Sequence, residues 1–204
     1  MKYNKIILLG FRYSGKSYIS KLLAEKINWK FIDLDIEVQK EKTSMELTRN
    51  GKDWSAYREI ETEVLKNLLA KDEKIVIAGG GGTAVAFDFP KDSGNKTYGD
   101  IQATILRQNK KLLKVFLLVK EEIIVERMLL DQKKPKQKSL RPTFNLMVEL
   151  AIKENRFESF VEKTLKVYRD RKPKYQNIAD IIMENNNNDD TDLLNKIVEY
   201  VEYI

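Results

Sequence analysis

Residues 6–17 read Ile-Ile-Leu-Leu-Gly-Phe-Arg-Tyr-Ser-Gly-Lys-Ser, and this stretch decides the fold. Its first four residues form an apolar run that predicts a buried strand. Gly10, Gly15, Lys16 and Ser17 then have the spacing G-x-x-x-x-G-K-S of a phosphate-binding P-loop. An amphipathic helical pattern follows the loop directly. A glycine-rich turn with an incidental lysine is the alternative, but it leaves the Lys-Ser pair at the helix start unexplained.

The residue types in this loop suit a bound triphosphate. The glycines allow main-chain amides to curl inward, and the helix that follows aims its unpaired amides at the β-phosphate. Lys16 would place its charge between the β- and γ-phosphates, and the Ser17 hydroxyl would ligate Mg²⁺. We therefore expect ATP to bind at Ser14, Gly15, Lys16, Ser17 and Tyr18.

The rest of the chain repeats the alternation of short apolar strands and helices. The further strand candidates are residues 31–33, 75–78, 115–119 and 178–183, and the further helical patterns begin at 36 and cover 58–70, 121–130 and 192–203. Short all-apolar strands separated by helices are typical of a parallel sheet covered on both faces. The predicted fold class is α/β, with a doubly wound parallel five-stranded sheet and helices on both faces.

Composition limits the chemistry that is available. The 204 residues are 42% hydrophobic and 33% charged, which fits one globular domain over 1–204. There is no cysteine and no histidine, so disulfides, thiol nucleophiles, zinc–cysteine sites and Ser-His chemistry are excluded. Catalysis must come from carboxylates, Lys, Arg, hydroxyls, main-chain amides and a bound metal ion.

Charge and hydropathy also indicate location and partners. The net charge of +6 is explained mostly by a solvated Lys/Glu surface, and it also favours small polyanions such as nucleotides. The lysines are spread without interleaved aromatic residues, so we expect no nucleic-acid partner. The first apolar run is too short for a signal peptide or a membrane span. We expect a cytoplasmic protein, a monomer, with no membrane partner.

Three stretches interrupt the alternation. Residues 83–110 contain Pro90, Gly94 and Gly99 and are interpreted as an inserted surface excursion, although 101–107 could be helical. Residues 131–141 are polar and lysine-rich, and we expect a mobile loop. Four consecutive asparagines at 185–188 are interpreted as a solvated linker before the last helix.

Candidate acceptor-side residues follow the second and third strands. Asp33 and Asp35 end the second strand candidate, where strand alternation would put both on one face. One could hold Mg²⁺ through water while the other accepts a hydrogen bond from an attacking hydroxyl. The alternative is that Asp35 caps the next helix. Arg58 could bind a substrate carboxylate through two hydrogen bonds, although such a residue is more often a surface arginine. The glycines at 79–82 would let main chain approach a small ligand, where the alternative is a flexible turn.

Taken in order along the chain, these features resemble the shikimate kinase family. The resemblance rests on the P-loop, Asp33-Leu34-Asp35, Trp54 with Tyr57-Arg58 and Glu61, the glycines after Ile75–Ala78, Arg141-Pro142, and Arg171-Lys172-Pro173-Lys174-Tyr175 with Ala179-Asp180. It spans nearly the whole chain. It implies a nucleoside monophosphate kinase-type fold, ATP with Mg²⁺, and transfer of the γ-phosphate to the 3-hydroxyl of shikimate, a small carboxylated polyol.

The resemblance also implies a role for each matching residue. Lys16, Asp35 and Arg141 would be catalytic, and Ser17 with Asp33 would face the metal. Arg127 would flank adenine, and Arg141 would reach over the phosphates from a lid at about 131–141. Shikimate would contact Asp35, Arg58, Gly80, Gly81 and Arg171, with the substrate-binding segment at about 33–73.

Four features depart from the family pattern. Tyr13 stands where a glycine is common, and Lys52 stands where an acidic residue is frequent. The excursion after Thr83 and the helical stretch between Arg141 and Arg171 are longer than expected. Another P-loop kinase, for gluconate or a nucleotide, is therefore an alternative. So is an ATP-binding regulatory protein without catalysis, with a nucleic-acid-dependent NTPase as a distant third.

Overall fold

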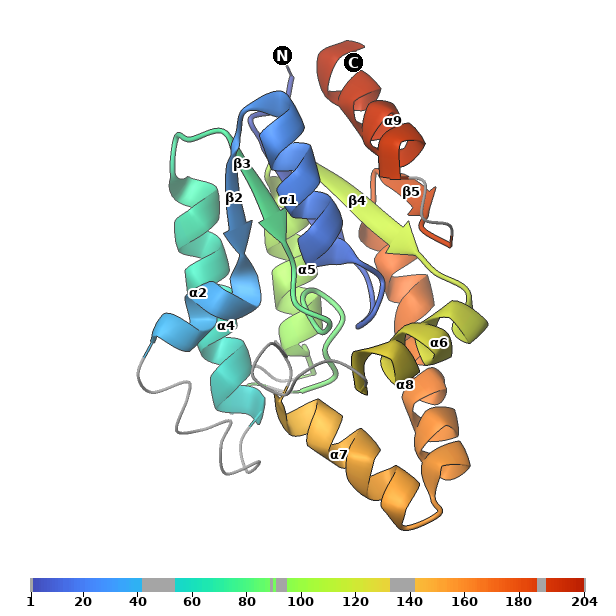
Figure 1. The fold of residues 1–204 in the computed structure, drawn as a ribbon. Helices are drawn as coiled ribbons and strands as arrows, with labels where there is room; N and C mark the ends of the chain where they lie inside the picture. The colour runs from blue at the N-terminus through green and yellow to red at the C-terminus, as the bar shows by residue number, and fades with distance from the viewer. Residues whose placement is uncertain are drawn as a thin grey trace.

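A parallel sheet forms the centre of the computed structural model, which describes residues 2–41, 54–88, 90, 95–132, 142–186 and 190–203 (Figure 1). Five strands lie in the order β2-β3-β1-β4-β5, and every neighbouring pair is parallel. Their bounds are Lys5–Leu9 (β1), Lys30–Asp33 (β2), Ile75–Ala78 (β3), Leu112–Leu118 (β4) and Ile181–Glu184 (β5). The predicted fold class is confirmed.

Helices cover both faces of this sheet, as the continuous apolar strands require. Their bounds are Lys16–Ile27 (α1), Leu34–Lys40 (α2), Trp54–Ala70 (α4), Tyr98–Gln108 (α5), Glu121–Gln132 (α6), Pro142–Lys153 (α7), Phe157–Ile178 (α8) and Asp190–Tyr203 (α9). Side chains alternate along β1, so Ile7 and Leu9 pack with α4, α5 and α8. Ile6 and Leu8 pack with α1 and α9 on the opposite face.

A third apolar cluster lies beyond the carboxyl ends of the strands. It joins the P-loop residues Phe11 and Tyr13 to side chains of α6, α7 and α8. Figure 1 shows α6 and α7 at this end of the molecule, while both termini lie at the other end. The helical stretch predicted between Arg141 and Arg171 is thus confirmed as α7 and most of α8, and its apolar face supports the phosphate loop.

The strand order indicates a ligand site between β1 and β3. From β1 the chain runs to β2, at one edge of the sheet. From β3 it runs in the opposite direction, past β1, to β4. In open parallel sheets, ligands bind at the carboxyl ends where such connections diverge. The P-loop follows β1 and the glycines at 79–82 follow β3, so both enter this crevice.

Two sequence expectations are corrected here. The described residues of 83–110 are not a surface excursion, because Thr83, Val85, Gln102 and Leu106 are buried. The helix considered for 101–107 is confirmed as part of α5. The last strand begins at Ile181, not at 178, because α8 continues through Ile178. Asp131 and Gln132 end α6, and the remainder of the expected lid, 133–141, lies outside the described residues. Within the described ranges, no helix combines the length and apolar character needed to cross a bilayer.

Candidate active site

The phosphate loop closes at Gly15, which is the N-cap of α1. Its φ of 84° lies in the left-handed region, where glycine avoids the penalty that a Cβ would bring. Lys16 begins the helix, is 5% exposed and donates from Nζ to the Phe11 carbonyl at 2.9 Å. The ammonium group is therefore held inside the curl of the loop, at the amino end of α1, where the helix dipole also favours anions.

Two side chains distant in sequence support this loop from outside. Asn185 is 5% exposed and donates from Nδ2 to the Ser14 carbonyl at 2.8 Å. Arg127 donates to the carbonyls of Tyr13 at 3.0 Å and Asn185 at 2.9 Å, and burial lowers its pKa. The interpretation of Asn185 as part of a solvated linker is therefore wrong. Arg127 lies against the phosphate loop, with its guanidinium directed to two main-chain carbonyls.

Tyr13 adopts a left-handed backbone conformation, which usually favours glycine. Its φ is 65°, a conformation that costs a non-glycine residue about 1–2 kcal/mol. The ring is 7% exposed and packs in the third apolar cluster, which offsets that cost. Tyr18, by contrast, is 58% exposed on α1, and its hydroxyl hydrogen-bonds the Asp190 carboxylate.

Ser17 and Asp33 form the pair expected to face a metal. The Ser17 hydroxyl donates to Asp33 Oδ2 at 2.6 Å. Asp33 Oδ1 caps α2 by accepting from the amides of Asp35 at 3.1 Å and Ile36 at 3.3 Å. The helix cap is thus Asp33, and the alternative that Asp35 caps the helix is wrong. In the part of the chain that the structure describes, no group of three or more His, Cys, Asp or Glu could hold a metal.

Asp35 lies in the first turn of α2 rather than on the strand, so the alternation argument for its orientation was wrong. It nevertheless enters the site: Tyr57 donates from its hydroxyl to Asp35 Oδ1 at 3.0 Å. Burial raises the Asp35 pKa, and the nearby carboxylates of Glu61 and Asp33 raise it further. The Lys16 ammonium and the Tyr57 hydrogen bond oppose that rise. The carboxylate is therefore a stronger proton acceptor than an ordinary aspartate.

Arg58 is buried in the site rather than on the surface. It is 7% exposed, and its Nη1 donates to Glu61 Oε2 at 2.7 Å, where Glu61 is fully buried. Burial disfavours the guanidinium charge, but Glu61 outweighs it and holds the pKa of Arg58 above its usual range. The rings of Trp54 and Tyr57 lie 5.8 Å and 5.3 Å from the guanidinium carbon.

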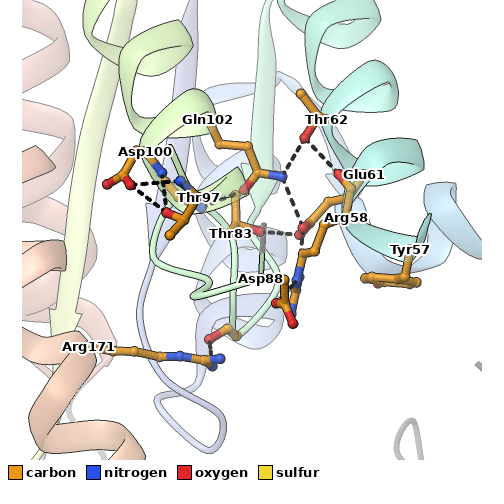
Figure 2. Close-up of polar contacts among 12 residues, drawn as sticks. Tyr57, Arg58, Glu61, Thr62, Thr83, Asp88, Thr97, Asp100, Gln102 and Arg171 are labelled. Atoms are coloured by element: carbon orange, nitrogen blue, oxygen red, sulfur yellow. Dashed lines mark hydrogen bonds and ion pairs between the residues drawn. The ribbon is translucent and has the colours of Figure 1, made fainter. Parts of the chain in front are cut away.

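A buried polar network holds Glu61, and sequence analysis missed most of it (Figure 2). Thr83 donates to Glu61 Oε1 at 2.7 Å, and Gln102 donates to Glu61 Oε2 at 3.1 Å. Gln102 also donates to Thr62 at 3.0 Å and accepts from the Ala84 amide at 2.7 Å. A capping box between Thr97 and Asp100 fixes the start of α5, the helix that carries Gln102. The network thus joins α4, α5 and the loop after β3.

That loop, the glycine loop (residues 79–82), passes directly over the predicted acceptor residues. A Cβ on Gly80 would come within 2.5 Å of Asp35 Oδ1, and a Cβ on Gly82 would overlap the Arg58 guanidinium. Glycine at these two positions allows the main chain to approach the Asp35 and Arg58 side chains this closely, and any larger residue would displace them. Gly82, which was not among the expected substrate contacts, therefore lies nearest to Arg58.

Arg171 reaches the same loop from α8 on the opposite side (Figure 2). It donates from Nη1 to the Gly81 carbonyl at 2.8 Å, and Tyr175 donates to the same oxygen at 2.7 Å. Burial lowers the Arg171 pKa, and the charge of Arg58 lowers it further. The structure therefore brings together Lys16, Asp35, the glycine loop and both arginines. Arg141 lies outside the described residues.

Comparison with known proteins gives the family. The family model described as Shikimate kinase matches residues 12–202. A shikimate kinase from Persephonella marina is 30% identical over 138 residues, which cover 59% of this chain and 84% of that protein. One from Aquifex aeolicus is 38% identical over 111 residues, covering 52% of this chain and 66% of that protein. Among solved structures, shikimate kinase from Acinetobacter baumannii in complex with shikimate has a TM-score of 0.67 at 22% sequence identity. The match covers 98% of this chain and 93% of that chain, and it supports the fold. The chain belongs to the shikimate kinase family.

Proposed function

We propose that this protein transfers the γ-phosphoryl group of ATP to the 3-hydroxyl of shikimate. The observation that carries the proposal is that two arginines and one carboxylate meet around the glycine loop, which lies next to the phosphate loop. Arg58 lies on α4 and Arg171 lies on α8, and the Asp35 carboxylate lies against Gly80. Two guanidinium groups beside a hydroxyl acceptor suit a small molecule that carries both a carboxylate and hydroxyls.

In the reaction, the 3-hydroxyl oxygen forms a bond to the γ-phosphorus as the bond to the bridging oxygen of ADP breaks. ADP leaves with the electron pair, and the hydroxyl proton passes to Asp35. The raised pKa of Asp35 suits it to accept that proton, and Tyr57 keeps the carboxylate oriented. Lys16 and the main-chain amides of the loop stabilise charge on the transferred group, since positioning and electrostatics dominate such transfers.

Ser17 and Asp33 fit Mg²⁺, the ion that accompanies ATP in such enzymes. Mg²⁺ prefers oxygen ligands and keeps several waters, so one hydroxyl and one nearby carboxylate are sufficient from the protein. The capping bonds to Asp33 Oδ1 leave Oδ2 directed at Ser17. When bound, the ion would neutralise charge on the phosphates. Arg141 is proposed to reach the phosphates from the lid, and Ser14, Gly15, Tyr18 and Arg127 to contact ATP.

The alternatives differ in what they predict for the acceptor. A gluconate- or nucleotide-type kinase would use the same phosphate loop, and a regulatory protein would bind ATP without transfer. The intact set of Lys16, Ser17, Asp33 and Asp35 favours an active enzyme. The cytoplasmic location, the single-domain organisation and the monomeric state stay predictions.

The test is the initial rate of ADP formation with ATP and Mg²⁺ across a panel of acceptors. We expect shikimate to stimulate ADP formation strongly, and gluconate and nucleoside monophosphates to leave it at the background rate. Stimulation by another acceptor would replace the substrate assignment. Saturable ATP binding with no stimulated turnover would favour the regulatory alternative.

A further inference from the structure

We propose that Asp88 is a resident carboxylate at the substrate-carboxylate site, and that shikimate must replace it on Arg58. The inference rests on the proposed function, because it concerns how the same site admits its substrate. Asp88 lies in the loop between the glycine loop and α5. It has no role in the reaction described above.

The neighbours of Arg58 leave the Nε edge of its guanidinium open to an anion, and Asp88 lies at that edge. Glu61 takes Nη1 at 2.7 Å, and the glycine loop lies against the Nη2 side at Gly82. The Tyr57 ring lies over the guanidinium, with its centroid 5.3 Å from Cζ. On the remaining edge, Arg58 Nε is 3.5 Å from Asp88 Oδ2 (Figure 2). A substrate carboxylate that binds Arg58 therefore meets Asp88 first.

This ion pair is loose, as a displaceable contact must be. Hydrogen bonds from N–H to oxygen usually measure about 2.7–3.2 Å, which is shorter than the separation of Arg58 Nε and Asp88 Oδ2. Arg58 Nε and Arg171 Nε are both buried, and neither finds a hydrogen-bond acceptor among the described residues. The charge of Asp88 acts on both guanidinium groups and supports the charged form of each. A carboxylate able to hydrogen-bond these donors would make better contacts than Asp88 makes.

Replacement requires the movement of one side chain rather than of a segment. The Asp88 side chain is 31% exposed, so water can receive its carboxylate when the side chain rotates. Its main-chain carbonyl accepts from the Tyr98 amide at 2.8 Å, which fixes the backbone to the start of α5. The carboxylate can therefore leave Arg58 while the polar network behind it stays intact.

Repulsion between carboxylates requires that Asp88 leave Arg58 when the substrate carboxylate binds. Arg58 already faces the carboxylates of Glu61 and Asp88, and a third carboxylate on the same guanidinium would add repulsion between like charges. Glu61 is fully buried with three hydrogen-bonding partners, so Asp88 is the group that leaves. The substrate then gains affinity only if its own carboxylate binds better than Asp88. Asp88 thus weakens the binding of carboxylated acceptors and leaves the binding of uncharged polyols unaffected.

The test compares Asp88→Asn with the unchanged protein by steady-state kinetics and by calorimetric titration of shikimate in MgADP. Asparagine keeps the shape but cannot compete as an anion, so we expect the KM and Kd for shikimate to fall about two- to fivefold, the range for one partly exposed ion pair. The KM for ATP and kcat should stay unchanged. Asp88→Glu keeps the charge and should show no gain. Glu199→Gln on α9 controls for the change in net charge.

Shikimate methyl ester separates competition for the carboxylate from a general structural effect. The ester has no anionic carboxylate, so Asp88→Asn should leave its affinity unchanged. An equal gain for ester and acid, an unchanged shikimate KM, or a weaker Kd in Asp88→Asn would each overturn the inference. If the unchanged protein neither binds nor phosphorylates shikimate, the proposed function itself is wrong. If it turns shikimate over normally and Asp88→Asn has the same KM and Kd for shikimate, only this inference is wrong.

Discussion

Replacement of Gln102 by leucine should destabilise the protein and weaken shikimate binding together. Gln102 is fully buried on α5 and makes three hydrogen bonds, to Glu61, to Thr62 and from the Ala84 amide. Leucine is of similar size, so Gln102→Leu leaves no large cavity. The effect comes from the polar groups that lose their partner.

The magnitude follows from those groups. A buried amide left without an acceptor, here that of Ala84, costs about 1–3 kcal/mol. Loss of a hydrogen bond to a charged group, here Glu61, costs about 1.5–3 kcal/mol. Thr62 keeps its 2.7 Å bond to the Arg58 carbonyl and adds little. We expect a loss of about 3 kcal/mol in the free energy of unfolding, or a Tm lower by about 6–12 °C at this chain length.

Thermal and urea unfolding of the two proteins measure this loss, and shikimate titration measures its consequence at the site. The KM for shikimate should rise more than that for ATP, because Glu61 orients Arg58 and Ala84 follows the glycine loop. Gln108→Leu, at the exposed end of the same helix, is the matched control and should leave stability nearly unchanged. A loss in Gln102→Leu no larger than in this control would refute the reasoning about the network.

Three further predictions concern the reacting groups. Asp35→Asn should lower kcat by about 10²-fold, the scale of a general base, and near-normal turnover would remove that role. Tyr57→Phe deletes a hydrogen bond that favours the charged form of Asp35, so the pKa of Asp35 should rise. The acid limb of the kcat/KM profile should therefore move to higher pH. Tyr168→Phe is the control, because the Tyr168 hydroxyl donates to the Val119 carbonyl and its loss should not move that limb. Arg58→Lys keeps the charge but loses the planar fork, so the KM for shikimate should rise about tenfold or more while the KM for ATP stays constant; equal increases would argue against a substrate-carboxylate role.

The elements that the sequence predicted best were those with a local signal. Apolar runs predicted β1 and β3, and the glycine and lysine spacing predicted the phosphate loop between β1 and α1. The position of Asp35 was predicted with a wrong reason. Its side chain enters the site from the first turn of a helix, which strand alternation does not describe.

Residues held by distant partners could not be predicted. Asn185 looks like part of a polar linker because its partner, the Ser14 carbonyl, is 171 positions away. Gln102 and Glu61 are polar residues on helices, and such residues are usually exposed. Their burial depends on α4, α5 and the glycine loop meeting, with 41 positions between the two side chains. The one local signal was Gln102 on the same face of α5 as the buried Ala103 and Leu106.

The position of the transferred phosphate tests the central claim most directly. With the carboxylate held by Arg58 and Arg171 and one hydroxyl directed to Asp35, a single ring hydroxyl can meet the γ-phosphorus. Phosphorus and proton NMR of the products formed from ATP, Mg²⁺ and shikimate should show one phosphate monoester, on the 3-hydroxyl, in an amount equal to the ADP released. A mixture of positional isomers, or inorganic phosphate in place of the ester, would contradict this arrangement of the site.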